Sequence, residues 1–289
     1  MNYKLIFAVP LRSKKSSLNW GGVQRNLNNT LKSIFNQTGD VPFKCIIACT
    51  DIPDIETEYG QNLEIIQLKL PEPHGHEECC KDKLYKLTSI AKRTKQILKE
   101  NSNSQEGIFF FPIDADDLIH KDIAKYVSEH FNENGFISDW GYVRYFSEWP
   151  YKRLLKREPY LFGFCGSCNI FKLMLNDLPD DLESYKTFKP NPDRYFFQVN
   201  HGCIPGEFEK NGRKFAILPF ATTVYMLGTK ENLSNIDPAY KNNKNVVSRL
   251  LPKIHLGFWL DFLKHPSNYS IVNKKINAEY GYVLKQDKD

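Results

Sequence analysis

The chain has 289 residues, of which 41% are hydrophobic and 13% are aromatic. This length and composition allow a substantial core and exclude a disordered chain. The 39 basic and 34 acidic residues give a net charge of +5, which is too small to indicate a nucleic-acid partner but is compatible with an anionic substrate or membrane surface.

Strand-like and helix-like segments alternate along the first half of the chain. Short runs of apolar, β-branched and aromatic residues that end at Pro or Asp are typical of buried strands. Apolar residues at helical spacing are typical of amphipathic helices. In chain order we expect a strand at 4–10, a helix at 19–39, strands at 43–50 and 63–70, a helix at 82–99, a strand at 108–113 and a helix at 120–131.

The second half has short strands and longer loops, without an internal repeat. Its segments are predicted as strands at 135–146, 163–171 and 214–227, an irregular polar region over 178–213, and helices from residue 238 onward. The alternation in the first half predicts an α/β fold with a parallel sheet covered by helices on both faces. Such sheets bind ligands beyond the carboxyl ends of their strands.

The sequence "FFFPIDADDLIH" (109–120) places Asp114, Asp116 and Asp117 at the end of the most apolar predicted strand. Closely spaced carboxylates repel one another unless a cation offsets their charge. Mg²⁺ and Mn²⁺ are usually held by one or two carboxylates, and water and substrate phosphates complete the shell. We therefore predict a Mn²⁺ or Mg²⁺ site at Asp114 and Asp116.

The seven cysteines form an odd set, and the opening "MNYKLIFAVPLRS" has too short an apolar run for a signal peptide. We expect free thiols and a cytoplasmic location. No segment reaches the roughly 18 to 20 apolar residues of a membrane span. Any membrane contact, at the inner face of the membrane, is therefore expected to be peripheral.

A first strand ending in "VP", a second strand ending near Asp51 and a helix before the acidic strand accompany "FFFPIDADDLIHKDI". Together these features resemble the GT-A-fold glycosyltransferases, in particular the family 2 type that adds sugars to bacterial surface polysaccharides. The resemblance implies a Rossmann-like mixed sheet flanked by helices. It also implies a nucleotide-sugar-binding half at 1–135, an acceptor-binding half at 136–235 and a C-terminal helical extension at 236–289.

The resemblance assigns roles to the acidic motif. Asp116 would coordinate a metal that bridges the diphosphate of a nucleotide sugar. Asp114 would face the ribose and reach the metal directly or through water, and Ala115 between them would belong to the donor-contacting segment. A bound cation stabilises the charge that develops on the leaving diphosphate.

The resemblance also implies a lining for the nucleotide. Pro10, Leu11 and Arg12 correspond to the loop after the first strand, and Asp51 corresponds to an acidic residue that contacts the base. Lys83 is expected to contact phosphate or base, although Lys81 and Lys86 are alternatives for this role.

An inverting transferase also needs a base that takes the proton of the acceptor hydroxyl. Asp193 in "NPDRYFFQVN" matches an acidic residue that precedes a helix in the family. The alternatives in the same irregular region are Asp180, Asp181, Glu183 and Glu207. The sequence departs from the family where a late His is usual, because Thr229 and Lys230 stand there, and His201 and His255 are the remaining candidates.

The expected function is transfer of a sugar, with inversion, from a UDP-linked donor to a glycan or lipid-linked acceptor. A second hypothesis is a phosphatase of the haloacid dehalogenase type, which also uses a "DxD" after an apolar strand. Asp117 and Leu118 do not fit the residues that such phosphatases carry after the second Asp. A third hypothesis is a non-catalytic carbohydrate-binding protein on a transferase fold. The sequence does not indicate an oligomeric state.

Three further segments invite interpretation. "HGHEECC" (74–80) and "CGSC" (165–168) lack the spacing of a zinc site, so we expect a loop that covers the donor pocket and buried thiols. Residues 140–164 interleave aromatic and basic side chains, which suits an acceptor carried on a lipid diphosphate. Residues 249–265 suit a helix that docks on its own domain, on a membrane or on a second subunit.

Overall fold

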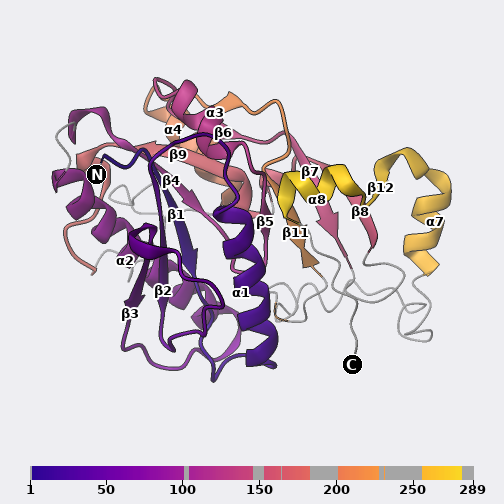
Figure 1. Ribbon diagram of the computed structural model, residues 1–289, viewed down its shortest axis with the longest axis horizontal. Coiled ribbons are helices and arrows are strands. Elements are labelled where there is room, and N and C mark those ends of the chain that lie inside the picture. Colours follow the sequence, from indigo (N-terminus) through magenta and orange to yellow (C-terminus); the bar gives the residue numbers. More distant parts are fainter. Residues whose placement is uncertain are drawn as a thin grey trace.

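The computed structural model describes residues 2–100, 104–145, 153–163, 165–182, 201–227, 231 and 256–281. Two sheets lie side by side in it, and helices pack against them (Figure 1). The fold is therefore α/β with helices flanking the main sheet, as the alternation of segments predicts, but the sheet is mixed and not purely parallel, because β9 (Asn169–Leu173) is antiparallel. It is compatible with a Rossmann-like arrangement.

The main sheet has seven strands in the order β10-β6-β9-β4-β1-β2-β3. The four consecutive strands β4, β1, β2 and β3 are parallel, and β9 runs antiparallel between β4 and β6. Apolar runs explain the central position of β1 and β4, because every residue of both strands is buried. The strands are β1 (Leu5–Pro10), β2 (Phe43–Cys49), β3 (Leu63–Gln67), β4 (Ile108–Pro112), β6 (Gly135–Ile137), β9 (Asn169–Leu173) and β10 (Ala216–Ile217).

Helices cover the two faces of this sheet. Alternate residues of β1 point to opposite faces, so Phe7 packs in the core under α1 (Trp20–Ile34), whereas Ile6 packs in the core under α2 (Gly75–Glu100). The first helix buries Val23, Leu27 and Leu31 along one stripe. Both faces of the sheet are thus buried. Functional side chains can therefore reach solvent only where the strands end and the loops begin.

The second sheet has the order β12-β8-β7-β11-β5 and a core of its own. Helix α8 (Lys274–Tyr280) covers this core with Ile276 and Tyr280, and the Tyr280 hydroxyl donates to the carbonyl of Ala221 at 2.9 Å. The strands are β5 (Leu118–Ile119), β7 (Trp140–Arg144), β8 (Leu154–Pro159), β11 (Thr223–Met226) and β12 (Tyr269–Ile271). The remaining helices are α3 (Ile123–Glu129), α4 (Ile204–Lys210) and α7 (Leu256–Lys264).

Several expected segments differ from the structure. Residues 75–80 begin α2, so the loop expected at 74–80 is wrong. The single strands expected at 135–146 and 214–227 are each two strands, one in each sheet. The strand expected at 163–171 starts only at Asn169, after a 3-10 turn. In the C-terminal part, described over 256–281, the strand β12 lies between α7 and α8.

All seven cysteines lie in the described part of the chain, and each carries a free thiol. Cys165 and Cys168 are buried, as expected, and so is Cys79. None of the helices over the described ranges is long and apolar enough to cross a bilayer.

His120 joins the two sheets. Its ring stacks on Phe220 with 4.3 Å between centroids and meets the edge of Tyr280 at 5.2 Å, and its Nδ1 accepts from the backbone N–H of Asp122 at 3.2 Å. Only 5% of the residue is exposed. This burial lowers the pKa of His120 from 6.5 to about 4, so the ring is neutral in the folded protein at neutral pH.

Folding stability should therefore fall on acidification because of His120. The unfolded ring binds a proton near pH 6.5 and the folded ring only near pH 4, so stability is lost as the pH falls through this window. A shift of this size corresponds to about 3 kcal/mol at most. The measurement is urea unfolding of the wild type and of His120→Asn, whose amide oxygen can still accept from the backbone N–H of Asp122. Between pH 6.5 and pH 4 the free energy of unfolding should fall more steeply with decreasing pH in the wild type than in the variant. Equal slopes would contradict the assignment.

Candidate functional site

The strand order of the main sheet reverses between β1 and β4. β1 pairs with β2 on one side and with β4 on the other, and all three run parallel. The backbone N–H of Leu11 donates to Ala48 at 2.9 Å, and that of Ile113 donates to Ala8 at 2.8 Å. The loops that begin at Leu11 and Asp114 therefore leave from neighbouring carboxyl ends, where an open α/β sheet forms its ligand-binding crevice.

Asp114 opens the acidic loop and is held on two sides. Its carboxylate is paired with the Lys83 ammonium of α2, and both side chains are partly buried. Its backbone N–H donates to the Ser167 hydroxyl at 2.9 Å. Burial alone would lower the pKa of Lys83, but the carboxylates of Asp114 and Asp117 raise it above its usual value, so the ammonium stays charged.

Asp117 is fully buried and ties the acidic loop to two distant segments. Its Oδ2 accepts from the Ser167 hydroxyl at 2.6 Å and from the Cys165 thiol at 3.6 Å. Its Oδ1 accepts from the backbone N–H of Met226, at the end of β11, at 3.0 Å. Since Ser167 also accepts from Asp114, the carboxylate of Asp117 fixes the conformation in which Asp114 and Asp116 are presented.

The acidic loop gathers three carboxyl groups. Burial raises the pKa of Asp117 well above its usual value, and the nearby charges of Asp116 and Asp114 raise it further, against the lowering effect of its hydrogen bonds. The Lys83 ammonium pairs with Asp114 in this group. A divalent cation would stabilise closely spaced carboxylates of this kind. Among the described residues no group of three or more His, Cys, Asp or Glu side chains forms a complete metal site.

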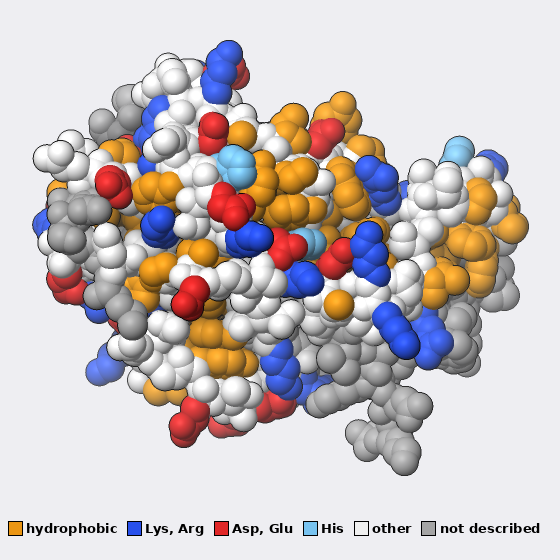
Figure 2. Space-filling view, turned by 45° about the horizontal axis from the view of Figure 1, so that its top comes forward, with side chains coloured by type: hydrophobic (Ala, Val, Ile, Leu, Met, Phe, Trp, Pro, Cys, Tyr) orange, Lys and Arg blue, Asp and Glu red, His pale blue; other side chains and the backbone are white. Residues whose placement is uncertain are grey.

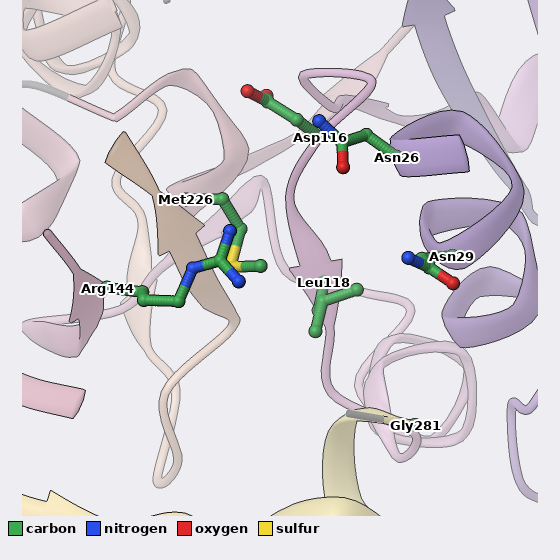
Figure 3. Close-up of a pocket in the computed structure, with 7 residues that line it drawn as sticks. All are labelled: Asn26, Asn29, Asp116, Leu118, Arg144, Met226 and Gly281. Carbon is green, nitrogen blue, oxygen red and sulfur yellow. The ribbon is translucent and has the colours of Figure 1, made fainter. Parts of the chain in front are cut away.

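Asp116 borders a small cavity between α1 and the second sheet (Figure 3). Figure 3 shows the Arg144 guanidinium reaching from β7 toward this cavity, while the Asp116 carboxylate, above Leu118 in the view, points away from the other labelled side chains. The volume, about 60 Å³, is far below the few hundred Å³ of a typical ligand pocket. The cavity is lined by Asn26, Asn29, Asp116, Leu118, Arg144, Met226 and Gly281.

The loop after β1 carries a second cation, Arg12. Pro10 and Leu11 are buried, and the Arg12 guanidinium donates to the carbonyl of Ser16 at 2.9 Å and to that of Glu231 at 2.6 Å, and it also pairs with the Glu231 carboxylate at 3.5 Å. Asp51, at the end of β2, accepts from the backbone N–H of Lys14 at 2.8 Å. Asp51 thus stabilises the loop that carries Arg12.

Of the three lysines considered for a phosphate contact, only Lys83 contacts the acidic motif. Lys81 pairs with Glu77 at 2.6 Å on the exposed side of α2. Lys86 is fully buried and pairs with Asp82, also at 2.6 Å.

The expected base, Asp193, lies outside the described residues, as does Glu183. Among the alternatives, Asp180 pairs with Lys95 at 2.8 Å and Glu207 pairs with Lys210 at 2.6 Å. Both of these carboxylates are therefore already engaged in ion pairs.

Sequence reasoning missed Ser167 and gave no role to Asp117. The position of Asp117 in an otherwise apolar segment could have suggested that its carboxyl group is buried. Its hydrogen-bond partners could not be found from the local sequence, because they lie 50 and 109 residues further along the chain. Sequence reasoning also missed Asn26 and Asn29, which look like ordinary polar positions of an amphipathic helix.

A larger cavity, of about 490 Å³, lies at the amino end of β4. It contains none of the expected site residues. Its lining consists of Gln105, Glu106, Phe131, Asn132, Asn134, Lys172, Met174 and Arg213.

No family model matches this sequence, and no curated protein is significantly similar to it. The chemical reading of the site therefore depends on its geometry.

Proposed function

We propose that this protein is a metal-dependent glycosyltransferase of the GT-A type, which moves a sugar from a UDP-linked donor to a glycan or lipid-linked acceptor with inversion. One observation carries the proposal. The acidic loop, with Lys83 paired to Asp114, and the loop that carries Arg12 leave from the neighbouring carboxyl ends of β4 and β1. Carboxylates that can hold a metal, beside cations that can contact phosphate, suit a nucleoside diphosphate.

The residues present fit a Mn²⁺ or Mg²⁺ ion that shares its shell with phosphate oxygens. Asp116 would be its main protein ligand and Asp114 a direct or water-mediated one, since Asp114 already pairs with Lys83. When bound, the cation neutralises charge on the diphosphate leaving group. The closeness of Asp114 and Asp116, whose charges add to the effect of burial in raising the pKa of Asp117, supports this reading.

The chain's own residues have two tasks in this proposal. Lys83 and Arg12 stabilise the charge on the diphosphate as the bond between the anomeric carbon and the phosphate oxygen breaks. A carboxylate, for which Asp193 remains our candidate, takes the proton of the acceptor hydroxyl as that oxygen bonds to the anomeric carbon. Asp117 and Ser167 hold the acidic loop in place.

Release of UDP from UDP-glucose, UDP-galactose and their N-acetyl forms, with Mn²⁺ or with EDTA, tests the function. Hydrolysis or transfer that needs the metal is expected. Cleavage of p-nitrophenyl phosphate without UDP release would instead indicate a phosphatase. Saturable sugar binding without any UDP release would indicate a carbohydrate-binding protein.

Lys83→Met is expected to weaken UDP binding about tenfold to a hundredfold, because a charge-assisted hydrogen bond to phosphate contributes about 1.5 to 3 kcal/mol. The matched control is Lys81→Met, which removes a lysine of the same helix that pairs only with the exposed Glu77. Calorimetric titration with UDP and Mn²⁺ measures both. Equal affinities for the two variants would remove Lys83 from the donor site.

A further inference from the structure

Helix α7 is attached to the second sheet by one of its sides. The rings of Phe258 and Phe262 each meet the ring of Tyr269 in β12 at 5.2 Å between centroids. Asp261 accepts from the Tyr269 hydroxyl at 2.5 Å and pairs with Lys156 at 3.0 Å. These contacts define the inner side of the helix.

The opposite side of α7 is also apolar. At 3.6 residues per turn, Leu260 and Leu263 fall opposite Phe258 and Phe262. Leu260 is 48% exposed and Leu263 is 71% exposed, and Ile271 of the neighbouring edge strand β12 is 65% exposed. A helix that only docks on its own domain would carry polar residues on its outer side, so this surface is suited to a partner.

Basic residues follow this apolar surface closely in the sequence. Lys264 follows Leu263 directly, His265 comes next, and Lys274 and Lys275 begin α8 a few residues later. Figure 2 shows hydrophobic side chains gathered at the right-hand end of the molecule, which α7 occupies in Figure 1, with Lys and Arg side chains beside them. Apolar residues flanked by lysines are typical of helices that lie in the headgroup region of anionic membranes.

The size of the surface distinguishes a membrane from a second protein copy. A helix of nine residues is about 14 Å long and about 10 Å wide. Its outer side thus offers about 140 Å², whereas a stable dimer buries about 800 Å² on each partner. A bilayer has no such minimum, because each inserted side chain adds to the binding on its own.

We propose that the outer side of α7, formed by Leu260 and Leu263, docks on an anionic membrane surface, with Lys264, Lys274 and Lys275 at the lipid headgroups. The docking does not depend on the proposed transferase activity.

Co-sedimentation of the full chain with lipid vesicles tests the proposal. Binding is expected with phosphatidylcholine vesicles that contain about one third phosphatidylglycerol, and little binding with phosphatidylcholine alone. Leu260→Glu and Leu263→Glu should each weaken binding roughly tenfold, because each places a charge where a leucine inserts. Salt at 1 M, where the Debye length is only about 3 Å, should weaken binding as well.

The matched control is Ile217→Glu, which changes an equally exposed apolar residue (62%) on β10 of the main sheet. It should bind vesicles like the wild type. Leu263→Ala, which keeps the helix and adds no charge, should weaken binding less than Leu263→Glu. Absence of binding to the phosphatidylglycerol vesicles, or an equal loss with Ile217→Glu, would overturn the proposal. A dimer in analytical ultracentrifugation that Leu263→Glu dissociates would also overturn it, in favour of a second copy as the partner.

Discussion

Asp116→Asn is expected to lower metal-dependent turnover of the sugar donor by about a hundredfold to a thousandfold, which is the usual effect of removing one group that stabilises transition-state charge. Within the acidic loop, Asp114 pairs with Lys83 and Asp117 anchors the loop through Ser167 and Met226, whereas Asp116 is the proposed main ligand of the metal. The amide keeps the shape of the side chain but removes the negative charge that would hold the metal. UDP release at saturating Mn²⁺ measures the effect.

Folding stability should not fall in Asp116→Asn, because the charge of Asp116 is one of the causes that raise the pKa of the buried Asp117. Removing it relieves repulsion. Asp40→Asn, at an exposed position after α1, is the control and should leave turnover unchanged. If Asp116→Asn turned over the donor like the wild type, the metal would not be held by this loop and the proposed function would lose its main support.

Asp117→Ala is expected to cause the largest loss of stability, about 2 to 4 kcal/mol in the free energy of unfolding. The substitution leaves the Ser167 hydroxyl and the Met226 N–H without their acceptor in a buried region, and each such group costs about 1 to 3 kcal/mol. Relief of the buried charge offsets part of this cost. Urea denaturation followed by fluorescence measures the difference.

Ser167→Ala distinguishes the contact of Asp117 with Ser167 from its contact with the backbone N–H of Met226. It removes the hydroxyl that links Asp114 to Asp117 and should cost about 1 kcal/mol. Because the two side chains are in contact, the double variant should lose less than the sum of the single losses. An Asp117→Ala protein within about 0.5 kcal/mol of the wild type would mean that Asp117 does not anchor the loop.

The sequence predicted the parts of the fold that depend on local pattern. Runs such as "KLIFAVP" and "IFFFPI" have no polar face, so they could only be strands buried on both sides, and the helix after the first of them shows an unbroken apolar stripe. The position of the acidic cluster at a carboxyl end followed from the same alternation of strands and helices.

The errors arose where partners are distant in sequence. The segment 214–227 is mostly apolar and looks like one strand, yet Ala216 pairs with Phe136 in the main sheet while Val224 pairs with Tyr142 in the second. Local hydrophobicity does not reveal a change of sheet. The role of Asp117 was hidden for the same reason, since its hydrogen-bond partners come from two other parts of the chain.

The strand order has a consequence for synthesis on the ribosome. The four parallel strands can pair once residue 112 has emerged, but β9, which pairs with the remaining edge of β4, spans residues 169–173. Chains emerge at about 5 to 20 residues per second. For about 3 to 12 seconds the nascent protein therefore holds four paired strands with the edge of β4 still open.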